Sequence, residues 1–296
     1  MINFNKDCLT IIFWDVQHGN AIYIKTPNNT QIIYDLGIGD YNGNNSKFSP
    51  LLFLRKKYGI QKFDQIIISH PDLDHLADIL NLASFSFHRF SRPHNITKNE
   101  IQEKINKSEN ETQKDIFREY LSLTEKYKYN VTPETDPTRP ENNGGVNIEL
   151  FYPLPDIMTN RTNNHSIVAL ISYASSKVML TGDNESASWK ELLVDQRFQK
   201  EIENTDIILA SHHGRESGYY PDLFKFFKPD LTIVSDGHVC DTSATSRYSA
   251  ISKGWAVFDQ NGKSNERKCV TTRNDGMVVV KIGYDNDGRP YLNVRI

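Results

Sequence analysis

The chain has 296 residues, of which 38% are hydrophobic and 24% are charged. These values are typical of a globular protein with a sizeable core, and the formal net charge of −3 excludes tight nucleic-acid binding through overall charge alone. No apolar stretch approaches the roughly 20 residues of a membrane-spanning helix, and residues 1–7 are polar, unlike a secretion signal. Three cysteines without a close pair favour a reducing compartment. We therefore expect a cytoplasmic protein without membrane contact.

The first part of the chain alternates short β-rich runs with turns. Residues 9–14, 21–26 and 31–34 have the composition of strands, and residues 50–58 have the apolar spacing of an amphipathic helix. Residues 65–69 form an apolar run of strand length, and a cluster of histidine and aspartate follows it directly. Because leucine and isoleucine then repeat at helical spacing, we expect the cluster on a loop between a strand and a helix.

The composition changes between residues 88 and 143. This segment is polar and charged, it shows helical spacing around Ile101 and Phe117, and prolines at 133, 137 and 140 interrupt its end. We interpret it as a largely helical insertion within a single domain that spans residues 1–296.

The second half of the chain repeats the strand-rich pattern. Strands are expected at residues 147–151, 166–173, 177–181, 206–211 and 231–235, helices at 189–198 and 220–227, and further strand-like runs in the tail at 278–282 and 291–294. Strand clusters in both halves, each with helices, predict an α/β (α+β) protein in which two sheets pack together under an outer layer of helices.

Four potential metal ligands fall within residues 70–75: His70, Asp72, Asp74 and His75. Packing four such groups together without a cation costs charge repulsion and desolvation. Imidazole and carboxylate together are ligands for a divalent first-row metal ion. The cluster therefore predicts a metal site.

Three further candidates lie at the ends of expected strands. His165 directly precedes an apolar run, whereas Asp183 and His212 each follow one. Taken alone, a histidine or a Gly-Asp pair at such a position is more often structural. A sheet can, however, gather side chains from distant strand ends at one rim, so we expect these three to join the 70–75 cluster.

The pattern His-x-Asp-x-Asp-His after an apolar strand resembles the first metal motif of the metallo-β-lactamase superfamily. It is most similar to the branch that resembles the C-terminal domain of the ComEC/Rec2 DNA-uptake proteins, in which aspartate replaces the second histidine, as at Asp72. Five further elements follow the family order: Asp15-Val16-Gln17-His18-Gly19-Asn20, Asp35-Leu36-Gly37, Asn163-Asn164-His165-Ser166, Leu180-Thr181-Gly182-Asp183 and Ser211-His212-His213-Gly214. Three features depart from the family pattern: Gln17-His18 in the first element, Arg215, and the insertion at Asn99–Pro140.

The resemblance implies a four-layered αββα sandwich that binds two divalent metal ions, Zn²⁺ or Mn²⁺. His70 and Asp72, with His165 as a further candidate, would hold one ion, while Asp74, His75 and His212 would hold the other and Asp183 would bridge the two. Asp74 would also orient the attacking water. His213 and His238 are candidates for proton donation or for binding a substrate oxyanion, and for His213 a structural hydrogen bond to the sheet is an equal alternative.

The chemistry implied is hydrolysis by a metal-activated water. We expect an enzyme that cleaves phosphodiesters, as a nuclease or as a phosphodiesterase acting on a small cyclic or linear nucleotide. Because a fold does not fix a substrate, a lactone, thioester or phosphorylcholine ester is an alternative, and so is a non-catalytic interaction module. A protein partner encoded by a neighbouring gene is also open, and the sequence does not predict an oligomeric state.

Overall fold

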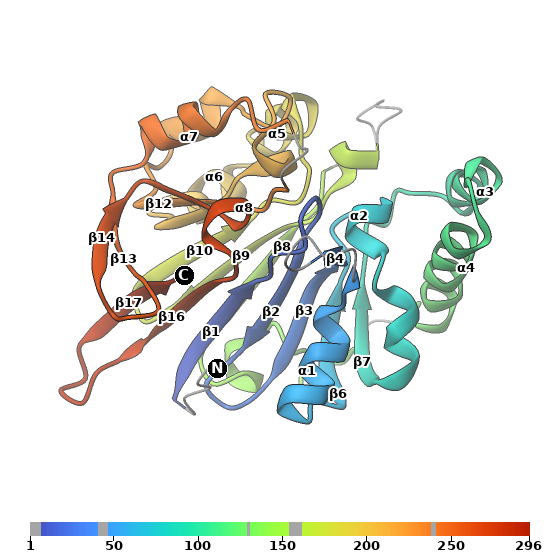
Figure 1. Cartoon of the computed structure of the whole chain (residues 1–296), viewed down its shortest axis with the longest axis horizontal. Helices are drawn as coiled ribbons and strands as arrows, with labels where there is room; N and C mark the ends of the chain where they lie inside the picture. Colours follow the sequence, from blue (N-terminus) through green and yellow to red (C-terminus); the bar gives the residue numbers. More distant parts are fainter. Residues whose placement is uncertain (1–6, 41–46, 129–130, 154–161, 238–240) are drawn as a thin grey trace.

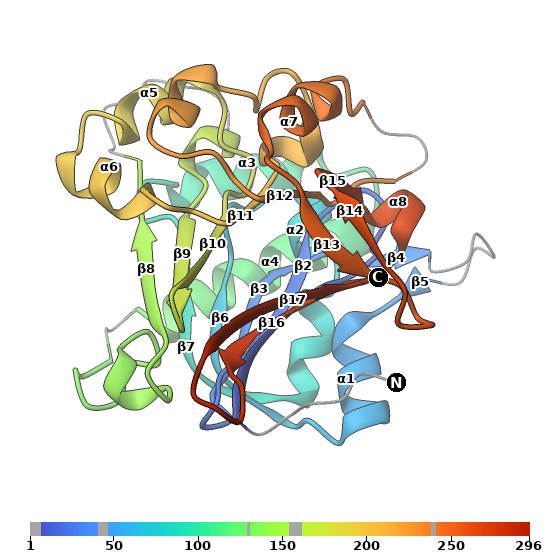
Figure 2. The same ribbon diagram turned by 90° about the vertical axis from the view of Figure 1, so that its left-hand side faces the viewer.

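The computed structural model describes residues 7–40, 47–128, 131–153, 162–237 and 241–296. Two sheets face each other within these residues, and helices cover both outer faces (Figures 1 and 2). This arrangement confirms the predicted four-layered sandwich. No helix in the described ranges is long and apolar enough to cross a membrane.

The larger sheet contains most strands of the first half of the chain together with the C-terminal strands. Its order is β14 (Ser264–Arg267), β13 (Trp255–Phe258), β17 (Pro290–Arg295), β16 (Val278–Tyr284), β1 (Cys8–Phe13), β2 (Ala21–Lys25), β3 (Gln31–Leu36), β6 (Lys62–Ile67) and β7 (Ser86–Ser91). Strands β3, β6 and β7 run parallel. Their carboxyl ends therefore meet at one edge of the sheet.

The smaller sheet comes from the second half of the chain. Its order is β15 (Cys269–Thr271), β12 (Leu231–Val234), β11 (Ile207–Leu209), β10 (Ser176–Leu180), β9 (Val168–Tyr173) and β8 (Asn147–Phe151), and a separate pair joins β4 (Gly39–Asp40) to β5 (Lys47–Phe48). The first four strands of this order are mutually parallel. The loops that follow β10, β11 and β12 consequently leave the sheet on the same side.

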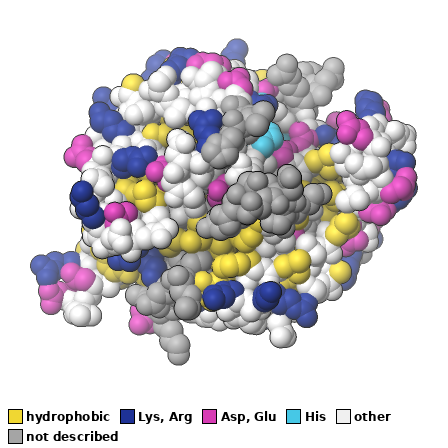
Figure 3. Space-filling view, viewed as in Figure 1, with side chains coloured by type: hydrophobic (Ala, Val, Ile, Leu, Met, Phe, Trp, Pro, Cys, Tyr) yellow, Lys and Arg dark blue, Asp and Glu magenta, His cyan; other side chains and the backbone are white. Residues whose placement is uncertain are grey.

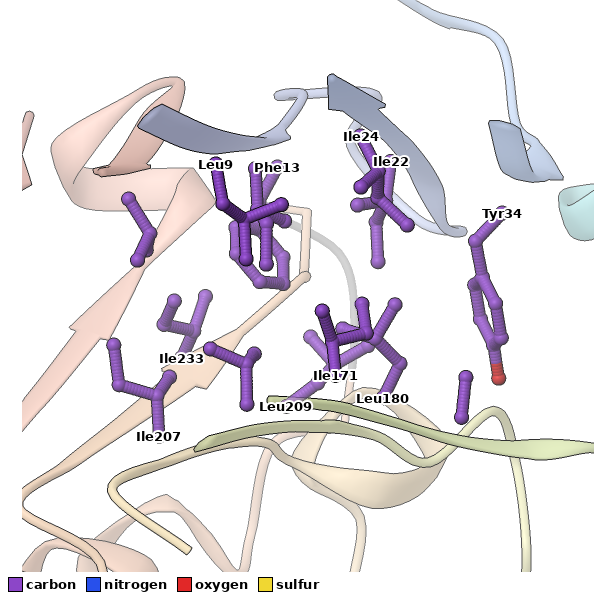
Figure 4. Close-up of a cluster of buried hydrophobic side chains, with 14 of the residues drawn as sticks. Leu9, Phe13, Ile22, Ile24, Tyr34, Ile171, Leu180, Ile207, Leu209 and Ile233 are labelled. Atoms are coloured by element: carbon purple, nitrogen blue, oxygen red, sulfur yellow. The ribbon is translucent and has the colours of Figure 1, made fainter. Parts of the chain in front are cut away.

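The main core lies between the two sheets. Alternate residues of β1, such as Leu9 and Phe13, point inward and pack against side chains of the smaller sheet such as Ile171 and Leu209 (Figure 4). The intervening Ile12 belongs to a second cluster on the outer face. This two-residue period is the strand geometry that the alternating sequence predicts.

Helices cover both outer faces of the sandwich (Figure 2). The large sheet is covered by α1 (Pro50–Tyr58), α2 (Leu73–Leu76), the 3₁₀ segment Ile79–Ser84, and the insertion helices α3 (Lys98–Lys107) and α4 (Glu111–Lys126). The small sheet packs against α5 (Ser186–Leu192) and α6 (Gln196–Ile202). The remaining helices are α7 (Thr245–Ile251), α8 (Thr272–Asp275) and short 3₁₀ segments at Pro140–Asn142, Thr162–His165, Ser211–Gly214 and Pro221–Lys225.

Helices α3 and α4 form a hairpin beside α2. Thr97 begins α3 with a capping box that includes Glu100, which satisfies two amide donors at the helix start. The hairpin buries Ile101 and Phe117 in the outer cluster of the larger sheet. The first residues of the 88–143 segment belong to β7, at the edge of that sheet. The division of the chain into one domain with an insertion stays a prediction.

The predicted helix at 50–58 and strand at 147–151 are confirmed residue by residue. The single helix predicted at 189–198 is wrong, because the chain turns between α5 and α6. At this turn Val194 is 77% exposed, and Asp195 caps α6 by accepting a hydrogen bond from the Arg197 amide. The helix predicted at 220–227 is a short 3₁₀ segment instead.

Candidate metal centre

Four potential ligands meet where loops of the two sheets approach each other. Asp74 and His75 lie on α2, Asp183 follows β10, and His213 follows β11. One ligand atom from each of the four lies within 4.8 Å of the others. His75 and His213 are 138 positions apart in the sequence, yet their Nε2 atoms are separated by only 3.3 Å. We call these four residues the metal group.

The carboxylates of the metal group lie between its two imidazoles. His213 Nε2 is 3.3 Å from Asp74 Oδ2 and 3.2 Å from Asp183 Oδ2. His75 Nε2 is 3.3 Å from Asp183 Oδ1. Three of the four residues are buried, and the Asp74 side chain is 24% exposed. The group therefore opens to solvent on the side of Asp74.

Backbone conformation delivers two of these side chains. Gly182 has a φ of +54°, and a Cβ at this position would lie 2.8 Å from the Ser166 Cβ, so glycine lets the loop after β10 pass close to its neighbours. His212 and His213 both have positive φ, at 50° and 55°. Two successive left-handed residues turn the chain sharply after β11 and direct the His213 ring inward.

The Nε2 atoms of the two imidazoles face each other. His75 Nδ1 lies 2.7 Å from Asp35 Oδ2, and His213 Nδ1 lies 2.9 Å from the Ser235 carbonyl oxygen. Both partners can only accept, so each Nδ1 carries a proton, and each ring has a lone pair on Nε2 whenever that nitrogen is deprotonated. With both Nε2 atoms deprotonated, the two lone pairs face each other between carboxylates and can bind one cation together.

The local electrostatics favour positive charge at the same point. Burial opposes protonation of both rings, but Asp183 and its neighbours outweigh it, raising the pKa of His75 well above its usual value and that of His213 to about 9. Burial also opposes ionisation of Asp183, but His213 and His75 hold its pKa well below its usual value. Its Oδ1 has no partner in hydrogen-bonding geometry among the described residues. This donor set fits a divalent cation.

Two predicted ligands, His70 and Asp72, lie beside the metal group. His70 is buried, and its Nε2 is 3.6 Å from Asp72 Oδ2 and 3.9 Å from Asp183 Oδ2. Asp72 Oδ1 lies 2.6 Å from the Nζ of Lys104. Burial disfavours the Asp72 carboxylate, but His70 and then Lys104 hold its pKa below the usual range.

The other predicted residues have different positions. The His165 ring contacts Asn95. His212 Nδ1 is 2.8 Å from the Ser217 hydroxyl, and its Nε2 is 3.8 Å from Asp183. His213 therefore belongs to the metal group and His212 lies beside it, while the metal role proposed for His212 stays a prediction. His238 lies outside the described residues.

Sequence reasoning assigned no role to two neighbours of the metal group. Asp35 is fully buried and orients His75. His18 Nε2 lies 3.2 Å from Asp74 Oδ2, and burial, followed by the charge of His213, lowers the His18 pKa to about 4. His18 is thus an uncharged neighbour of Asp74 at neutral pH. The Asp35-Leu36-Gly37 element at the end of an apolar run was the available signal for Asp35.

A cleft of about 460 Å³ opens over the metal group, lined by His18, Asp72, Leu73, Asp74, Asn163, Asp183, Glu185, His212 and Arg215. Figure 3 shows acidic side chains near a surface histidine on the face viewed. Arg215 contributes positive charge to the wall. Its NH1 is 3.1 Å from His212 Nε2, and its buried Nε has no hydrogen-bond partner among the described residues.

Comparison with known proteins gives one family match and several distant relatives. The family model described as "Metallo-beta-lactamase superfamily" matches residues 14–238. Recombination protein 2 of Haemophilus influenzae is 25% identical over 223 residues, which cover 75% of this chain and 24% of that protein, so the chain spans about a quarter of the relative's length.

Solved structures are similar at low sequence identity. The metallo-beta-lactamase fold protein YhfI from Bacillus subtilis has a TM-score of 0.49 and 13% identity, covering 93% of this chain and 99% of that one. A diphosphatase from the PhnP family has a TM-score of 0.44 and 10% identity, covering 93% of this chain and 98% of that one.

Proposed function

The chain belongs to the metallo-β-lactamase superfamily, and from this premise we propose that it is a metal-dependent hydrolase that cleaves phosphodiester bonds in nucleic acid or in a small nucleotide. The observation that carries the proposal is the metal group, in which two imidazole nitrogens and two carboxylates converge beneath an open cleft. A divalent cation would replace the protons that the carboxylates otherwise hold on His75 and His213.

The residues of the metal group divide the work between them. Asp74, His75, Asp183 and His213 would hold the cation, which, when bound, neutralises charge on the attacked group and lowers the pKa of a water molecule. Asp74 is the most exposed of the four, so its carboxylate is placed to orient that water. His18 holds the Asp74 carboxylate from the cleft side. His213 serves here as a ligand, in place of the proton-donating role considered from the sequence.

The cleft wall supports an anionic substrate. Arg215 offers a buried N–H without a hydrogen-bond partner among the described residues, and guanidinium groups bind phosphate oxygens in a fixed, forked geometry. The name of the Haemophilus influenzae relative refers to recombination, a process of DNA, which favours a nucleic-acid substrate. The net charge of −3 disfavours extended contact with a duplex. A short single strand or a small nucleotide therefore suits the cleft best.

The test is a substrate panel assayed with Mn²⁺, with Zn²⁺ and with chelator. The panel contains bis-p-nitrophenyl phosphate, single-stranded DNA, plasmid DNA, RNA, a cyclic dinucleotide, a lactone and a thioester. We expect metal-dependent cleavage of phosphodiesters by the wild type and none by Asp74→Asn or His75→Ala. His88→Ala is the matched control, because His88 is an exposed histidine on β7, and it should retain wild-type turnover.

Each other outcome contradicts a defined part of the proposal. Cleavage of the lactone or thioester without any phosphodiester cleavage would keep the metal chemistry and remove the substrate class. No turnover on any substrate, with either metal, would favour a non-catalytic interaction module. Wild-type turnover in His75→Ala would mean that the metal group is not the active site.

A further inference from the structure

A lysine of the insertion reaches the cluster beside the metal group. Lys104 lies on α3, and its Nζ is 2.6 Å from Asp72 Oδ1. The Thr162 hydroxyl donates to the same oxygen at 2.8 Å and lies 3.4 Å from the ammonium. The Lys104 and Asp72 side chains are 25% and 30% exposed, so most of this ion pair is withdrawn from solvent. One carboxylate oxygen of Asp72 is thus already occupied by a positive charge and a hydroxyl.

A second residue of the insertion contacts another expected ligand. Asn95 precedes α3, and its side-chain nitrogen contacts His165 Nδ1. Three residues, His70, Asp72 and His165, were expected to hold the first metal ion. Two of these three are therefore engaged by side chains from the 88–143 segment.

One observation, made at the Nε2 of His70, favours a second cation. His70 Nε2 is buried and has no hydrogen-bond partner among the described residues. A cation bound there would, however, share Asp72 with the Lys104 ammonium, and like charges in a partly buried site repel strongly. The carboxylate nearest to His70 after Asp72 is Asp183, at 3.9 Å, and Asp183 already belongs to the metal group. The balance therefore disfavours a second metal ion.

We infer that Lys104 supplies the second positive charge of this site in place of a second metal ion, so that the chain binds one divalent cation per molecule. The inference rests on the proposed metal-dependent function, and it replaces the expectation of two ions. It also gives the insertion a role in the site, because α3 carries the ammonium and Phe117 of α4 lies 5.9 Å from it. The hairpin thereby holds the charge next to Asp72.

The test is the metal content of the full chain and of Lys104→Met, which keeps the aliphatic stem without the charge. Each protein is loaded with excess Zn²⁺ or Mn²⁺, desalted and measured by inductively coupled plasma mass spectrometry, with circular dichroism to check the fold. We expect one equivalent in the wild type and two in Lys104→Met. Lys104→Arg should return to one. Lys107→Met, which changes a 78% exposed lysine on the same helix, should also bind one.

The possible outcomes separate this inference from the proposed function. Two equivalents in the wild type, or one in both the wild type and Lys104→Met, would overturn the inference and leave the metal-dependent function intact. A wild type that retains no metal would overturn the proposed function itself. Should Lys104→Met fail to fold, Lys104→Gln provides the same comparison with an uncharged polar side chain.

Discussion

In a metal-binding imidazole, the hydrogen bond made by one ring nitrogen determines whether the other nitrogen has a lone pair for the metal. Asp35 accepts hydrogen bonds from His75 Nδ1, from the Ser69 amide and from the Ser69 hydroxyl, each at 2.7 Å. A carboxylate fixes the tautomer in which His75 Nε2 carries the lone pair, whereas an amide could donate to Nδ1 and invert it. We expect Asp35→Asn to lower Zn²⁺ affinity by about 10- to 100-fold, measured by isothermal titration calorimetry.

Asp64→Asn is the matched control for this change. Asp64 also accepts a hydrogen bond from a backbone amide, that of Gln31 at 2.8 Å, but it does not line the cleft. Its variant should bind Zn²⁺ as the wild type does. Equal affinities for Asp35→Asn and the wild type would show that the tautomer of His75 is not what Asp35 controls.

Individual residues of the candidate site were predictable to different degrees. The 70–75 cluster could be predicted because its four potential ligands, two histidines and two aspartates, lie within six positions of the sequence. The choice between His212 and His213 could not, since it depends on two successive left-handed residues that rotate the chain after β11. The ion pair between Asp72 and Lys104 could not be predicted either, because the apolar spacing of α3 does not indicate that Lys104 lies over the 70–75 cluster.

At the scale of elements, the loop after β10 depends on a glycine. Gly182 has a φ of +54°, and a Cβ there would lie 2.8 Å from the Ser166 Cβ and 2.9 Å from the Ser69 Cβ. Gly182→Ala would add both backbone strain and a clash, so we expect a loss of roughly 2–4 kcal/mol in the free energy of unfolding. Because Asp183 follows directly, metal affinity should also fall. Urea denaturation and calorimetry measure the two effects.

The control separates strain from crowding. Gly262 has a φ of +80°, and a Cβ added to it would meet no atom within 4 Å, so Gly262→Ala should cost only the strain of about 1–2 kcal/mol and leave metal binding unchanged. Equal losses in the two variants would mean that the loop after β10 tolerates the extra methyl group.

Elements with a buried apolar run were predicted well, whereas the exposed edge strand β14 was not. Every residue of strand β1 is buried, and helix α1 buries Pro50, Leu51 and Leu54 on one side. By contrast, β14 is largely exposed, so its sequence shows no alternation to recognise, and it forms only through pairing with β13. The break between α5 and α6 is set by capping at Asp195. Apolar spacing over a long stretch does not reveal a single capping residue, so the break was missed.

At the scale of the molecule, the metal group joins the two halves of the sandwich. Asp74 and His75 come from the connection between β6 and β7 of the larger sheet, whereas Asp183 and His213 follow strands of the smaller one. The family resemblance read from the motifs, which is confirmed by the match over residues 14–238, covers both halves for the same reason. The inter-sheet core holds the sheets together without the metal group. The fold should therefore persist when the metal is removed.

Removing the metal should therefore lower the stability of the fold without unfolding the protein. A cation that binds only the folded chain adds about 2.7 kcal/mol at a free concentration of one hundred times its Kd. For a chain of this size each kcal/mol corresponds to a shift of roughly 2–4 °C in Tm, so chelator should lower the Tm by about 5–10 °C. The far-ultraviolet circular dichroism should not change, because the inter-sheet core stays packed. His75→Ala should melt at the same temperature with and without chelator. If the wild-type Tm changes neither with chelator nor with added Zn²⁺ or Mn²⁺, then no cation bridges the sheets at this position.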